Sequence, residues 1–133
     1  MVEAKEWDKE AILELIHQKS LFYGVSEAVM VKVVTCENPE FDPKLQSYVI
    51  ESDGKREESW GIAQWHIPSK NRKKDGSIIT KEDALNPELA LDNMAWYFSR
   101  GLASRWTCYR MLVQSSIINQ NAKNLNRNKE KSF

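Results

Sequence analysis

The sequence lacks several features that would point to a nucleic-acid or membrane protein. Lysines plus arginines equal aspartates plus glutamates, at 19 each in 133 residues, so the net charge indicates no nucleic-acid partner. No apolar stretch approaches the ~18 residues that cross a bilayer. The first ten residues are rich in both acids and bases, which is not the pattern of a signal peptide. What remains is the composition of one globular domain, with 41% hydrophobic and 29% charged residues.

Cysteine and histidine are also scarce, with two of each. Cys36 and Cys108 allow at most one disulfide, and their number alone favours free buried thiols. His17 and His66 are too isolated from other ligand residues to form a metal site. We therefore expect neither a metal nor a cofactor.

Two helices are expected in the first third of the chain. The first is predicted over about residues 7–19, with Gly24 ending that element, because its apolar residues fall on one face: Trp7, Ala11, Ile12, Leu15 and Ile16. Ser26 is a suitable N-cap for the second, which is apolar on nearly all sides from Ala28 to Val34. The valines also permit a strand, but the length and the cap favour a buried central helix.

The periodicity changes between Leu45 and Trp60. Pro39 and Pro43 prevent the helix from continuing. Alternating residues then lead into an Asp53-Gly54 turn, which predicts a short hairpin. Residues 68–76 are expected to form an irregular polar loop.

The second half of the sequence predicts helices again. Thr80 and Asp83 have the spacing of a capping box, and Asn86-Pro87-Glu88 is a stronger helix start, with Gly101 as the stop. A last helix is expected over 104–118. The fold class is therefore α+β and mostly α, with one domain over 1–118 and a polar basic tail over 119–133 that we expect to be frayed or disordered.

Glu37 is the residue most in need of a chemical explanation, because it ends the apolar helix. The negative end of the helix dipole and apolar surroundings both raise the pKa of a carboxyl group. A carboxylic acid kept protonated near neutral pH is what glycosidic-bond cleavage requires of its general acid. The alternative is that Glu37 is a solvent-exposed acid without a function, and its position alone favours that alternative.

The block Ser59-Trp60-Gly61-Ile62-Ala63-Gln64-Trp65 follows the predicted hairpin. Gly61 permits a close approach between backbones. Gln64 offers a donor and an acceptor for sugar hydroxyls or N-acetyl groups. The tryptophans of the block are able to stack on sugar rings, although core packing is their more frequent role.

Three blocks in order carry a family resemblance. They are Glu37-Asn38-Pro39-Glu40-Phe41-Asp42-Pro43, Ser59-Trp60-Gly61-Ile62-Ala63-Gln64, and Asn86-Pro87-Glu88-Leu89-Ala90-Leu91 with Tyr97 beyond it. With Tyr23-Gly24-Val25 before them, they resemble the transglycosylase SLT domain of the lysozyme-like superfamily, to which soluble lytic transglycosylases and goose-type lysozymes belong. The match covers roughly residues 8 to 112.

The resemblance implies a lysozyme-like fold whose central helix ends in the catalytic glutamate, Glu37, with a small hairpin beside the cleft. It implies cleavage of the MurNAc–GlcNAc β-1,4 bond of peptidoglycan, as in cell-wall-degrading lytic transglycosylases and muramidases. Substrate contacts would then come from Ser59, Gly61, Gln64, Trp65, Tyr97 and Trp106.

The departures from the family bear on the mechanism. Asn38 stands where the family has serine, and the family's late Ala-Tyr-Asn-x-Gly block is absent. Animal-type lysozymes, which share the Gly-Ile-x-Gln segment, carry an aspartate where this chain has Ser59. This favours a single-acid route in which the sugar's own C6 hydroxyl attacks and leaves a 1,6-anhydro end. Hydrolysis assisted by a second carboxylate, Glu58 or Glu57, is the rival, and a glycan-binding module without activity is the other alternative.

The same resemblance changes the expectation for the cysteines, since it places Cys108 in a closing helix near Cys36. A Cys36–Cys108 disulfide and two free thiols are then equally favoured, and a disulfide would imply an oxidising compartment. We expect a monomer that meets peptidoglycan strands outside the cytoplasm, in the periplasm, after secretion, or delivered by a phage. No signal peptide is visible to account for export.

Overall fold

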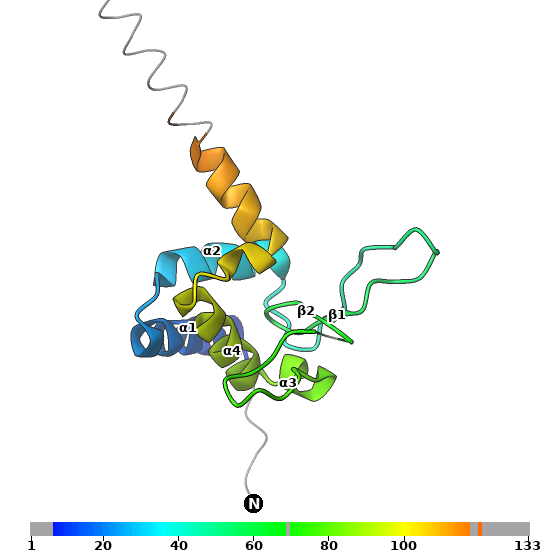
Figure 1. Ribbon diagram of the computed structural model, residues 1–133, viewed down its shortest axis with the longest axis horizontal. Coiled ribbons are helices and arrows are strands. Elements are labelled where there is room, and N and C mark those ends of the chain that lie inside the picture. Colours follow the sequence, from blue (N-terminus) through cyan, green and yellow to red (C-terminus); the bar gives the residue numbers. More distant parts are fainter. Residues whose placement is uncertain (1–6, 69, 118–119, 121–133) are drawn as a thin grey trace, which may run out of the picture. The chain divides into compact units, whose positions relative to one another are not determined.

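The order of elements places four helices and a two-stranded sheet before a short 3₁₀ turn (Figure 1). A computed structural model describes residues 7–68, 70–117 and 120. The elements are α1 (Lys9–Tyr23), α2 (Glu27–Glu37), β1 (Ser59–Trp60), β2 (Trp65–His66), α3 (Lys81–Leu85), α4 (Pro87–Ser99) and η1 (Ala103–Arg105). A further helix occupies 107–117. The fold is therefore mostly helical with a small sheet, in agreement with the predicted class.

The chain divides into two compact units, Met1–Ala103 and the segment from Ser104 onward. The single domain expected over 1–118 stays a prediction. The predicted tail over 119–133 falls almost wholly outside the described residues. The first unit holds α1 to α4 and the sheet, and the second holds the helix over 107–117.

The core of the first unit forms where α1 packs against α2 and α4. Seven large apolar side chains on these helices have no exposed surface: Ile12, Ile16, Met30, Val33, Val34, Leu91 and Met94. Burial of each such side chain stabilises the fold by about 1.5–3 kcal/mol. However, α2 is less enclosed than its apolar sequence predicts, because Val29 and Val31 are only partly buried and Thr35 is exposed.

The helix boundaries follow their caps closely. Asp8 Oδ1 accepts a hydrogen bond from Ala11 N at 2.8 Å, and Ser26 Oγ accepts one from Val29 N at 3.2 Å. Gly24 ends α1 with φ of 68°, a left-handed conformation that favours glycine. The cap at Ser26 and the stop at Gly24 confirm the predictions, whereas α1 runs from Lys9 to Tyr23 and not over 7–19. The last helix begins at residue 107 rather than 104.

The sheet differs from the predicted hairpin. β1 pairs antiparallel with β2, so that Ser59 lies opposite His66 and Trp60 lies opposite Trp65. The predicted hairpin is present as an arm, residues 46–57, held by isolated bridges between Gln46 and Trp60 and between Ile50 and Arg56. The arm extends away from β1 and β2 (Figure 1). Periodicity located the turn at Gly54 but not the pairing of β1 with β2.

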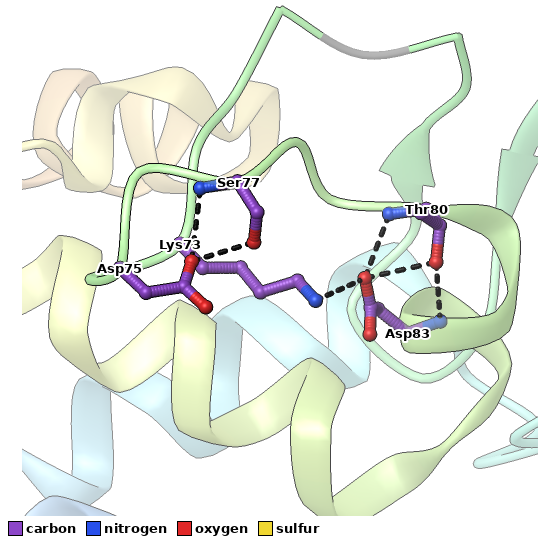
Figure 2. A network of polar contacts seen from close by, with 5 residues as sticks. All are labelled: Lys73, Asp75, Ser77, Thr80 and Asp83. Carbon is purple, nitrogen blue, oxygen red and sulfur yellow. Dashed lines mark hydrogen bonds and ion pairs between the residues drawn. The ribbon is translucent and has the colours of Figure 1, made fainter.

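Asp83 joins the loop after β2 to the start of α3. Its Oδ2 accepts hydrogen bonds from Thr80 N at 2.8 Å and Thr80 Oγ1 at 2.9 Å, and forms an ion pair with Lys73 Nζ at 3.0 Å (Figure 2). Thr80 Oγ1 in turn accepts from Asp83 N at 3.2 Å, which completes the predicted capping box. In the same loop Asp75 Oδ1 accepts from Ser77 N at 2.9 Å. The loop predicted to be irregular is therefore tied to α3 at its end.

The pKa of Asp83 is lowered from its ordinary value of 3.8. Burial raises it, but the Thr80 backbone N–H, the Lys73 ammonium and the Thr80 hydroxyl together outweigh burial. Because the pKa in the folded chain lies below that in the unfolded chain, the charged carboxylate stabilises the fold above pH 3.8. That stabilisation is lost as the pH falls through the lower, folded pKa.

Replacing Asp83 by asparagine should therefore lower the free energy of unfolding by about 1–2 kcal/mol at neutral pH, since a charge-assisted hydrogen bond is removed. The difference between wild type and variant should shrink as the pH falls below about 4. Urea unfolding, followed by tryptophan fluorescence at a series of pH values, measures this difference in the free energy of unfolding. Asp53→Asn, which alters an exposed turn aspartate, controls for the loss of one charge. A difference that stays constant down to about pH 2 would contradict the assignment.

Candidate active site

Glu37 is the last residue of α2 and is partly buried. The helix ends there because Asn38 leaves the helical conformation, with φ of −144° and ψ of 75°, and Pro39 follows it. The carboxylate of Glu37 therefore lies at the carboxyl end of a helix whose inner face carries three fully buried side chains, Met30, Val33 and Val34.

Asn38 connects this helix end to the β1–β2 segment. Its side chain has no exposed surface, and its Nδ2 donates to the carbonyl oxygens of Asp42 at 2.7 Å and Gly61 at 3.1 Å. Asp42 N donates to Asn38 Oδ1 at 3.2 Å. These bonds hold the turn 38–42, in which Phe41 has a positive φ of 53°, and fix Glu37 relative to Gly61. Sequence reasoning noted Asn38 only as a departure from a family pattern and missed this role.

Gly61 lies against the backbone of α3. It has φ of 82°, and a Cβ placed on it would lie 1.8 Å from the carbonyl oxygen of Ala84. Gly61 N also donates to Leu45 O at 2.8 Å. The close approach predicted for this glycine is confirmed, and its contact with substrate stays a prediction.

Gln64 supports the turn between the two strands. It has a positive φ of 52°, and its Nε2 donates to Leu45 O at 3.0 Å and Gly61 O at 2.8 Å. Among the described residues nothing donates to its Oε1. The amide nitrogen is thus committed to the protein, while the amide oxygen remains free to accept a hydrogen bond from a ligand.

Ser59 is 4% exposed, and its Oγ donates to Glu57 Oε1 at 2.6 Å. The same Oγ lies 3.4 Å from His66 Nδ1, on the partner strand. Glu58 is exposed and accepts a hydrogen bond from Trp60 Nε1 at 3.0 Å. The side chain of Ser59 is therefore hydrogen-bonded to the carboxylate of Glu57, whereas that of Glu58 is bonded to Trp60.

The aromatic residues predicted to contact sugar have other partners. Trp65 is 3% exposed, donates from Nε1 to Ala90 O at 3.1 Å and packs edge-on against Tyr97. Tyr97 is 4% exposed, and its hydroxyl bonds both the N–H and the carbonyl of Arg72, at 2.8 and 2.9 Å. Both residues take part in packing and loop attachment, and their contact with substrate stays a prediction. Trp106 is 5% exposed, and its contact with substrate stays a prediction.

Cys36 and Cys108 are each disulfide-bonded, and the free thiols favoured by cysteine number alone are not found. Within the described residues, no three His, Cys, Asp or Glu side chains group as a metal site would need. No helix in the described part of the chain has the length and apolar character required to span a membrane.

Comparisons of this chain with models of known protein families, with curated proteins and with solved structures gave no match.

Asn38→Ala should lower the free energy of unfolding by about 2–4 kcal/mol, because it removes three hydrogen bonds made by a side chain with no exposed surface and takes the acceptor from the Asp42 N–H. Asn86→Ala, which removes an exposed N-cap, should cost only about 1 kcal/mol. Urea unfolding of the two variants under one condition measures both losses. Equal losses would show that the buried amide does not hold the turn.

Gly61→Ala should be far more damaging than Gly54→Ala. Both glycines have φ of 82°, but a Cβ at Gly54 meets nothing within 4 Å. Gly54→Ala should therefore cost only the left-handed backbone penalty, about 1–2 kcal/mol. Gly61→Ala should cost at least about 4 kcal/mol or prevent folding. Thermal unfolding by circular dichroism and soluble yield measure the difference, and similar melting temperatures would contradict the close approach.

Proposed function

We propose that this chain cleaves the β-1,4 bond between MurNAc and GlcNAc in peptidoglycan, with Glu37 as the general acid, on a lysozyme-like fold. One observation carries the proposal. The partly buried Glu37 ends α2, and the neighbouring Asn38 amide ties that helix end to Gly61, at 3.1 Å, in the segment that carries Ser59 and Gln64. A glycosidase needs its acid held in such a fixed position beside a polar surface.

In this proposal Glu37 protonates the glycosidic oxygen as the bond to C1 breaks. Ser59, Gly61 and Gln64 are the proposed substrate contacts, because Asn38 donates to Gly61 O and Gln64 Nε2 donates to the same carbonyl. Gln64 Oε1 accepts from a sugar hydroxyl or N-acetyl N–H. The C6 hydroxyl of the substrate or a water then attacks C1. The first outcome defines a lytic transglycosylase and the second a muramidase.

The substrate also suggests where the chain works. Peptidoglycan strands lie outside the cytoplasm, which agrees with two cysteines in disulfide form, because disulfides persist in oxidising compartments. We propose that the chain acts there as a monomer and without a cofactor.

Incubation with purified peptidoglycan tests the proposal, with soluble muropeptides as the readout. Wild type should release them, and Glu37→Gln, which keeps the shape of the side chain but cannot donate the proton, should be slower by about 10²–10⁴-fold. Glu14→Gln, on the exposed face of α1, is the matched control and should retain wild-type activity. Circular dichroism checks that both variants fold.

Two results would overturn this assignment. Release of no soluble product by wild type would leave a glycan-binding module as the better description. Undiminished release by Glu37→Gln would remove Glu37 from the mechanism.

A further inference from the structure

The carboxyl end of α1 carries two large apolar side chains in solvent. Leu21 is 69% exposed and Phe22 is 74% exposed, the two highest values among the exposed large apolar residues of the described part of the chain. A single exposed apolar side chain is common on a protein surface and needs no explanation. Here two of them are adjacent, so the end of this helix offers apolar surface to a partner.

The end of α1 is firmly held, although it is exposed. Tyr23, the last residue of the helix, donates from its hydroxyl to Asp92 Oδ2 in α4 at 2.8 Å. Lys19 Nζ forms an ion pair with Asp92 Oδ1 at 3.0 Å. The Phe22 ring packs edge-on against the Tyr23 ring, with 4.9 Å between the centroids. Phe22 is thus presented on a fixed support, which lowers the entropy cost of covering it with a partner.

A lysine from a distant part of the sequence joins these aromatic rings. Lys74 Nζ lies 4.2 Å from the centroid of the Tyr23 ring and 5.4 Å from that of Phe22. Both distances lie within the ~6 Å of a cation–π contact. Among the described residues, no carboxylate forms an ion pair with the Lys74 ammonium. Its positive charge therefore lies beside the apolar side chains and is not neutralised there.

Lys74 belongs to a short hairpin with an excess of positive charge, in which an isolated bridge pairs Arg72 with Ile78. Residues 70–76 include four basic side chains and one acidic side chain: Lys70, Arg72, Lys73, Lys74 and Asp75. Lys73 points to Asp83 and forms an ion pair with it (Figure 2). Three positive charges and one negative charge remain after that ion pair, so the hairpin keeps a net charge of +2.

The acidic residues close to the end of α1, by contact or in sequence, are already compensated. Asp92 has Lys19 as its ion-pair partner, and the Glu27 carboxylate at the start of α2 lies 2.9 Å from His17 Nδ1. The hydrogen bond and the charge of Glu27 raise the pKa of His17. Glu14 is exposed on α1, but it lies eight residues before the exposed ring, about 12 Å along the helix axis. This helix end thus combines apolar side chains with positive charge that no described residue neutralises.

We propose that Leu21, Phe22 and Lys74 form a docking surface for a lipid bilayer that contains anionic headgroups. The two apolar side chains enter the boundary between headgroups and acyl chains, and the Lys74 ammonium contacts lipid phosphate. Such docking goes beyond the proposed function and does not depend on the cleavage of any substrate.

The chemistry of this surface favours a lipid over the other partners that basic surfaces bind. A nucleic acid stacks its bases on aromatic rings, but Leu21 has no ring, and the rings of Phe22 and Tyr23 already contact Lys74 and each other. A free phosphate ion would use Lys74 and leave both apolar side chains in water. A second copy of the chain would bring two positively charged hairpins together. A bilayer with anionic headgroups satisfies the apolar side chains and the charge at once.

Co-sedimentation of the full chain with vesicles tests the proposal. Vesicles of equal parts phosphatidylglycerol and phosphatidylcholine should bind the chain. Vesicles of phosphatidylcholine alone should bind it at least about five-fold more weakly, the ratio expected when one lysine loses its attraction to an anionic surface. Binding to the mixed vesicles should also weaken as the salt concentration rises. No binding to the mixed vesicles, or equal binding to both kinds, would overturn the docking surface and leave the proposed function standing.

Variants with matched controls locate the surface. Phe22→Ser should weaken binding to the mixed vesicles by at least about ten-fold, because the burial of a phenylalanine side chain is lost. Ile50→Ser removes a side chain of similar exposure, 62%, from the arm and should bind like wild type. Lys74→Gln should weaken binding by about five-fold, whereas Lys32→Gln, on the exposed side of α2, should not. Circular dichroism checks that all four variants fold. Equal losses in a variant and its control would overturn the assignment of these residues.

Two further measurements distinguish a bilayer from the other partners. Without vesicles, wild type and Phe22→Ser should elute alike as monomers in size-exclusion chromatography, and a dimer that Phe22→Ser dissociates would assign the surface to a second copy. A single-stranded oligonucleotide should not bind through this surface. Oligonucleotide binding that Phe22→Ser abolishes would assign the surface to a nucleic acid, and either of these results would overturn the proposal.

Discussion

The buried amide of Asn38 is the interaction on which the rest of the site depends. Its two polar atoms satisfy three backbone groups, at Asp42 and Gly61, in a place with no access to water. An unsatisfied buried group costs about 1–3 kcal/mol, so alternative arrangements of the turn are penalised. The end of α2 and the β1–β2 segment, 23 residues apart in sequence at this bond, are thereby held together. The hydrogen bonds of Asn38 therefore fix the position of the adjacent residue, Glu37.

Gly61 supplies the second constraint, because a Cβ at this position would collide with the Ala84 carbonyl. The side chains near this approach make different contacts. Gln64 Nε2 donates to Leu45 O, and Ser59 Oγ donates to the Glu57 carboxylate. Trp65 donates to Ala90 O in α4, and Tyr97 donates to Arg72 O in the loop before α3.

Local structure was predictable wherever one residue acts on its own neighbours. Ser26, Asn86 and the Thr80–Asp83 box cap the helices as expected, and Gly24 ends α1, because caps and left-handed turns depend on side chains within three or four residues. The pairing of β1 with β2 was missed, because two-residue strands carry no usable periodicity.

By itself the sequence determined that Glu37 ends an apolar helix and that a block containing Ser59, Gly61 and Gln64 follows a turn at Gly54. Those facts are encoded locally, by caps, prolines and apolar spacing. Only the tertiary structure decided that Asn38 is the buried connector, that Tyr97 bonds Arg72, and that Ser59 bonds Glu57. Each of these depends on which polar group finds which partner after burial. Hydrogen-bonding capacity is visible in a residue's chemistry, but the choice of partner is made by packing.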